Sequence, residues 1–139
     1  MTTAWTKESL QATLDDSPAI KFHGIEVSEL DIDQYRLVLK MPLKPELERA
    51  PDSNQFHGGP VATLIDTAGD FVVALAVGGG VPTINFRVDY LKPCTGPALI
   101  ATASVRRAGR TVAVADIDIT NSDGILCAVG RGTYLSMVG

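Results

Sequence analysis

Residues 57–80 read HGGPVATLIDTAGDFVVALAVGGG, and this stretch decides the fold. Its apolar side chains recur at the three- and four-residue spacing that places them on one face of an α-helix. They are Val61, Leu64, Ile65, Ala68, Val72 and Leu75. Pro60 suits the first turn of a helix, where its missing N–H costs nothing, and Gly78-Gly79-Gly80 ends the pattern. Because most flanking residues are also apolar, we expect a long helix that is buried on nearly all sides.

The chain after this helix is expected to be all strand. Runs of strand-forming residues, several of them alternating apolar and polar, are separated by turn signals. These runs cover roughly residues 82–91, 98–107, 111–120 and 125–135. The short connections between them favour an antiparallel meander of four strands.

The chain before the helix begins with a short helix of its own. Residues 6–14 predict this helix, with Thr6 as its cap and Ser17-Pro18 as the interruption that follows. Residues 19–41 are predicted to be extended, because apolar side chains recur at every second position there. A polar turn at 31–34 would divide this segment into two antiparallel strands.

The overall organisation is predicted to be one domain over residues 1–139, in which residues 1–18 form the N-terminal helix and lead-in. Residues 42–53 hold three prolines and are expected to form a loop. One helix packed on one antiparallel sheet is an α+β arrangement. We expect the sheet to wrap around the central helix, because that arrangement buries a helix that is apolar on most sides.

The composition narrows the choice of partners and compartment. A hydrophobic fraction of 45% in 139 residues can build a core without disulfides or metals. The net charge of -4 argues against a general binder of nucleic acids. Cys94 and Cys127 form no metal-binding or redox motif, so we expect reduced thiols in the core. The N-terminus lacks a signal-peptide pattern, and the apolar stretch at 71–81 is too short for a bilayer, so a cytoplasmic protein without a membrane partner is expected.

Three features around the long helix could carry chemistry. His57-Gly58-Gly59 lies directly before the helix, where free N–H groups and the helix dipole can hold a developing oxyanion. Asp66 and Asp70 lie one turn apart in an apolar helix, where an unpaired carboxylate is costly. Thr83 opens a strand and could place its hydroxyl in the same pocket. Each feature alone also fits a structural role, as a flexible loop, a hydrogen-bonded carboxylate or a strand former, and the combination is what points to a site.

Residues 55–69, QFHGGPVATLIDTAG, resemble the HGG signature of the PaaI-like (phenylacetate-degradation-type) hotdog-fold thioesterases. The segments VDYLKP at 88–93 and DGILCAVGRGTY at 123–134 are similar to later strands of that family, and the resemblance covers residues 20–136. It implies the hotdog fold and the hydrolysis of acyl-CoA thioesters to free acid and coenzyme A. Coenzyme A would be part of the substrate, with no other cofactor and no metal. The acyl group, and the choice between coenzyme A and acyl carrier protein, stay open.

The resemblance also implies roles for single residues. Asp66 would be the general base for water or the nucleophile that attacks the thioester carbonyl. The N–H of Gly58 would stabilise the oxyanion, His57 would orient the thioester or the loop, and Thr83 would position water or Asp66. In this family the site lies between subunits, so Asp66 and Gly58 can come from different chains. A homodimer is therefore the expected minimum, and a homotetramer is the expected assembly.

The chain departs from the family pattern just before the HGG segment. Relatives often carry Asn six residues before the histidine and Gly three residues before it, whereas this chain has Pro51 and Asn54. We expect Asn54 or Gln55 to supply the missing amide. Gly59, which has no side chain, would let the substrate approach the backbone closely.

A basic hairpin is the candidate site for the phosphates of coenzyme A, although a solvated turn would look the same in sequence. Its cations are Arg106, Arg107 and Arg110. Two other functions stay open beside thioester hydrolysis. One is a hotdog dehydratase or hydratase, for which no matching segment is present, and the other is an acyl-CoA binding module without turnover.

Overall fold

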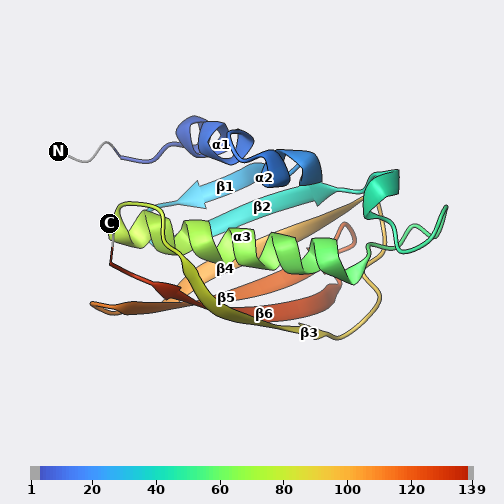
Figure 1. The fold of residues 1–139 in the computed structure, drawn as a ribbon. Coiled ribbons are helices and arrows are strands. Elements are labelled where there is room, and N and C mark those ends of the chain that lie inside the picture. The colour runs from blue at the N-terminus through green and yellow to red at the C-terminus, as the bar shows by residue number, and fades with distance from the viewer. Residues whose placement is uncertain (1–3, 138–139) are drawn as a thin grey trace.

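The structure, a computed structural model, describes residues 4–137. A six-stranded antiparallel sheet curves around one long helix, and two short helices lie near the N-terminus (Figure 1). In chain order the elements are α1 (Lys7–Asp15), α2 (Pro18–His23), β1 (Glu26–Asp31), β2 (Arg36–Pro42), the 3-10 helix η1 (Pro45–Leu47), α3 (Gly58–Val77), β3 (Thr83–Tyr90), β4 (Ala98–Ala108), β5 (Val112–Asn121) and β6 (Leu126–Leu135). The predicted α+β arrangement, with the sheet around a central helix, is confirmed.

The central helix α3 forms where the sequence predicts it. It begins after the N-cap His57 and ends at Gly78, whose φ of 89° lies in the left-handed region that favours glycine. All six apolar positions that predicted the helix are buried. By length and composition α3 could cross a membrane, but its apolar side chains pack in the core that the sheet encloses. The hydrophobicity of α3 therefore follows from its place in the core.

The sheet has the order β1-β2-β4-β5-β6-β3, and this corrects one prediction. β4, β5 and β6 pair in sequence order, whereas β3 pairs with β6 at the far edge of the sheet. The expected meander of four strands is wrong because β2 occupies the other edge of β4, with Leu37 opposite Ala103. The connection at 91–97 carries the chain from β3 to β4 across one end of the sheet (Figure 1).

The N-terminal region confirms one prediction and corrects another. Thr6 caps α1, and its hydroxyl accepts a hydrogen bond from the N–H of Ser9 at 3.0 Å. The prediction that residues 19–41 are extended is wrong at its start, where α2 forms. Ser17 is the N-cap of α2 and Pro18 is its first residue, a combination that favours helix initiation. Pro18 therefore starts a second helix as well as ending the first.

The edge strand β3 keeps apolar side chains outside the core. Ile84 is 53% exposed and Phe86 is 40% exposed. An edge strand also presents unpaired backbone N–H and C=O groups, which can pair with another chain.

The two cysteines, Cys94 and Cys127, are buried free thiols, as predicted.

Candidate active site

Asp66 lies in the middle of α3 and is held by hydroxyl groups from two strands. Its Oδ1 accepts a hydrogen bond from Thr83 Oγ1 at 2.9 Å and a longer one from the Tyr134 hydroxyl at 3.5 Å. Thr83 and Tyr134 stand opposite each other where β3 pairs with β6, so the sheet register brings both hydroxyls to one carboxylate. Oδ2 accepts no hydrogen bond from residues 4–137, and this oxygen is not fully buried. One oxygen of Asp66 is therefore fixed, and the other is available to a reactant.

A hollow of about 330 Å³ borders Asp66. Its walls come from α2, α3 and β3, with Ile20, Phe71 and Phe86 as apolar side chains. Asp70, one helical turn beyond Asp66, lines the same hollow. Burial, and then the charge of Asp66, raise the pKa of Asp70 from 3.8 to about 7. Asp66 and Asp70 therefore both border this hollow, and the Asp70 carboxyl group keeps its proton to a higher pH than an ordinary aspartate does.

We expect Asp70→Asn to raise the melting temperature at neutral and alkaline pH. The native Asp70 carboxyl holds its proton at pH values where the unfolded chain has already lost it. Wild-type stability therefore falls as the pH rises from about 4 to about 7. Asparagine removes this loss, and because Asp70 is only half-buried we expect a gain of about 1 kcal/mol, or about 3 °C, near pH 8.

Calorimetric melting at about pH 4 and about pH 8 measures this difference. The matched control is Asp118→Asn, because Asp118 is an exposed carboxylate on β5. A gain for Asp70→Asn that is equal at both pH values would contradict the titration of Asp70 as its cause.

The start of α3 leaves one N–H group free. The N–H of Gly59 donates to Nδ1 of the capping residue His57 at 3.3 Å, and Pro60 has no N–H. The N–H of Gly58 donates to no acceptor within residues 4–137. It also lies at the positive end of the helix dipole. Gly58 is therefore the donor that a developing oxyanion would meet at this helix start.

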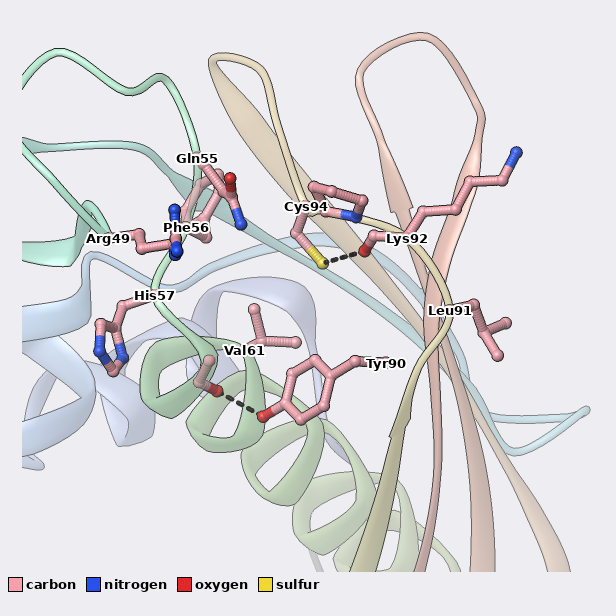
Figure 2. A pocket seen from close by; sticks show the side chains of 11 residues that line it. Arg49, Gln55, Phe56, His57, Val61, Tyr90, Leu91, Lys92 and Cys94 are labelled. Atoms are coloured by element: carbon pink, nitrogen blue, oxygen red, sulfur yellow. Dashed lines mark hydrogen bonds between the residues drawn. The ribbon is translucent and has the colours of Figure 1, made fainter.

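A second hollow, of about 520 Å³, surrounds the start of α3. Figure 2 shows Gln55, His57 and Tyr90 around it. The Tyr90 hydroxyl donates to the carbonyl oxygen of Gly58 at 2.6 Å, which ties the end of β3 to the first turn of α3 (Figure 2). No three His, Cys, Asp or Glu side chains gather anywhere in residues 4–137 in a way that could hold a metal ion.

The two hollows are separate within one chain. Gly58 and Asp66 are eight residues apart on α3, which corresponds to about 12 Å along the helix axis. A thioester carbonyl must lie about 3 Å from both a nucleophile or base and an oxyanion donor. Asp66 and Gly58 of the same chain therefore cannot act on the same carbonyl group.

The sequence profile of the thioesterase superfamily matches residues 54–128, which contain both Asp66 and Gly58. The chain belongs to the thioesterase superfamily. It is 38% identical over 136 residues to a Halobacterium salinarum protein whose name places it provisionally among the esterases, over 90% of this chain and 88% of that one. It is also 34% identical over 97 residues to the Salmonella typhimurium medium/long-chain acyl-CoA thioesterase YigI, over 57% of this chain and 61% of that one.

Solved structures agree with this membership. The Escherichia coli PaaI protein from the phenylacetic acid degradation operon is 26% identical, with a TM-score of 0.81, over 95% of this chain and 93% of that one. A thioesterase of Haemophilus influenzae is also 26% identical, with a TM-score of 0.85, over 96% of this chain and 92% of that one. The resemblance to PaaI-like hotdog thioesterases is therefore confirmed, and this thioesterase superfamily member is a thioester hydrolase.

The other predicted site residues lie in different places in this thioesterase. Gln55 lines the hollow at the start of α3, whereas Asn54 borders a separate hollow with Lys44 and Glu48. Asn54 has a φ of 56°, a left-handed conformation that asparagine tolerates better than most residues. The asparagine at this position therefore has a backbone explanation, since the family pattern places glycine there.

The basic hairpin lies at the other end of the sheet from the start of α3 in the same chain (Figure 1). Beside it, Ser136 N–H donates to Thr111 O and Leu135 N–H donates to Pro82 O, so the hairpin neighbours the turn between α3 and β3. Arg106, Arg107 and Arg110 therefore lie toward the Asp66 half of a chain and not toward its Gly58 half.

Two tyrosines that the sequence analysis does not select contact the candidate site residues. Tyr134 reaches Asp66 from β6, and Tyr90 reaches Gly58 from the end of β3. Both contacts cross long stretches of sequence, and both depend on the pairing of β3 with β6. Gly130 and Gly132, two residues apart on β6, are the sequence feature that could have indicated these contacts. Glycines inside a strand often mark a place where another part of the protein approaches the backbone closely.

Proposed function

We propose that this thioesterase hydrolyses acyl-CoA thioesters to free acid and coenzyme A, with Asp66 as base or nucleophile. The observation that supports it most directly is the carboxylate with one fixed oxygen and one available oxygen, beside a hollow. The Salmonella relative, which is named a medium/long-chain acyl-CoA thioesterase, supports the choice of acyl-CoA as the substrate class. The alternatives, a dehydratase or a binding module without turnover, receive no comparable support from the site.

The chemistry can follow one of two balanced routes. Asp66 Oδ2 can take a proton from water while the water oxygen bonds to the thioester carbon, and the C–S bond then breaks as the thiolate leaves. Alternatively, Oδ2 can bond to the carbon itself, expel the thiolate and form an anhydride that water hydrolyses. In both routes negative charge develops on the carbonyl oxygen. The N–H of Gly58 is the donor we assign to that oxygen.

The site would be completed by two chains. Because Asp66 and Gly58 of one chain lie too far apart, we assign the oxyanion donor to a second copy. The exposed apolar edge of β3, with Ile84 and Phe86, supports a homodimer in which two such edges meet. The expected homotetramer would be two of these dimers.

Two measurements test this proposal. The first is thiol release from aromatic, medium-chain and long-chain acyl-CoA esters. Turnover of at least one ester is expected, and the absence of turnover on all of them would sink the proposal. Binding without turnover would instead favour the binding module.

The second measurement is subunit complementation. Asp66→Asn and Gly58→Pro chains with different tags are co-expressed, and dimers that carry both tags are isolated. A site shared between chains leaves one of two sites intact in the mixed dimer, so about half of wild-type activity is expected. A site within one chain would leave each site with one lesion, and the mixed dimer would stay as inactive as its parents.

A further inference from the structure

Tyr134 is a large side chain with no exposure to solvent, yet it ends in a polar group. Its hydroxyl lies 3.3 Å from the backbone oxygen of Asp66 and 3.5 Å from Oδ1 of the same residue. A buried phenol needs a hydrogen-bond partner, and both available acceptors belong to Asp66. The tyrosine therefore approaches the carboxylate from inside the core, opposite to any reactant.

Two glycines make room for this approach. A Cβ at Gly132, two residues earlier on β6, would lie 2.2 Å from the Tyr134 hydroxyl oxygen. A Cβ at Gly69, on the face of α3 above, would lie 2.1 Å from the same oxygen. Real Cβ atoms never come so close, so the ring lies flat along β6 and under α3 only because both positions are glycine.

We infer that Tyr134 is a positioning residue for the reaction, which fixes Oδ1 of Asp66 together with Thr83 so that Oδ2 is presented to the thioester. This inference rests on the proposed role of Asp66. Thr83 is half-buried on an edge strand, whereas Tyr134 is anchored in the core, so the tyrosine supplies the rigid part of the support. A preorganised carboxylate loses less free energy when it reaches the reactive geometry.

The surroundings keep Tyr134 in its donor form. Burial, and then the charges of Asp66 and Asp70, raise the pKa of the phenol above its ordinary value of 10.0. Beside Tyr134 and Asp66, the other titratable group is Asp70 on α3. Thr83 on β3, which also contacts Asp66, is uncharged. The hydroxyl therefore donates to Asp66 throughout the pH range in which the enzyme would be assayed.

The test is Tyr134→Phe, which keeps the ring and removes the hydroxyl. We expect kcat to fall about tenfold with an unchanged KM, the size of effect that the loss of one hydrogen bond to a charged group produces. Tyr35→Phe is the matched control, because Tyr35 is 42% exposed and lies in the turn between β1 and β2.

A second route displaces the hydroxyl without removing it. Gly69→Ala places a Cβ against the Tyr134 oxygen, and the same fall in kcat with an unchanged KM is expected. In an Asp66→Asn background, Tyr134→Phe should cause no further loss of the residual rate. An unchanged kcat in folded Tyr134→Phe would overturn the inference, and so would an equal fractional loss with and without Asp66. If Asp66→Asn alone stays active, the proposed function fails, and the positioning role fails with it.

Discussion

Asp66→Asn is expected to lower kcat for thioester hydrolysis by about 10³-fold or more, since it removes the base or nucleophile. The amide has nearly the same shape as the carboxylate, and its oxygen can still accept the hydrogen bond from Thr83. It can neither take a proton from water nor attack a carbonyl group. The rate is measured by thiol release at saturating acyl-CoA, with circular dichroism to verify the fold.

The control for this variant is again Asp118→Asn, an exposed carboxylate on β5 that stands opposite Val129, whereas Asp66 meets β6 at Tyr134. Near-wild-type turnover by Asp66→Asn would remove Asp66 from the mechanism. Hydrolysis by the wild type in heavy-oxygen water tests the anhydride route. The label enters the Asp66 carboxylate only if Oδ2 has bonded to the thioester carbon and water then attacks the Asp66 carbon of the anhydride. Label in the product alone is the result expected if Oδ2 acts as a base, or if water attacks the acyl carbon of the anhydride.

The local half of this site could be predicted from sequence because it is contiguous. Gly58 and Asp66 lie on one helix. The spacing of its apolar residues, Pro60 in its first turn and the glycines after its last turn predict this helix from sequence. α1 was predicted for the same reason, since Thr6 caps it from the neighbouring residue. Period and capping are short-range properties, and they need no knowledge of the rest of the fold.

The other half depends on strand pairing, which local patterns do not determine. The alternation in β3 predicted a strand correctly, but not that it pairs with β6 at an edge. Tyr134 meets Asp66 across 68 residues because that register places it opposite Thr83. Among residues 4–137, the hydroxyl groups that reach the Asp66 carboxylate come from Thr83 and Tyr134, and both meet it through this strand pairing.

Gly58→Pro is expected to lower kcat by about 10²- to 10³-fold, because it deletes the single N–H assigned to the oxyanion. The substitution suits the backbone, which makes it a sharp test. Gly58 is the first residue of α3, where proline is favoured. His57 before it has φ -65° and ψ 151°, the extended conformation that a residue before proline prefers.

Gly58→Ala is the matched control, because it adds a Cβ at the same place and keeps the N–H. That Cβ would lie 3.3 Å from the Tyr90 hydroxyl, a contact that a small movement of this exposed side chain relieves. The difference in kcat between the alanine and proline variants therefore isolates the hydrogen-bond donor.

Equal rates for the two variants would mean that the N–H of Gly58 does not stabilise the transition state. A large fall for proline alone would place the developing charge at the start of α3, about 12 Å from Asp66 of the same chain. Such a result would require that a second chain supply the carboxylate.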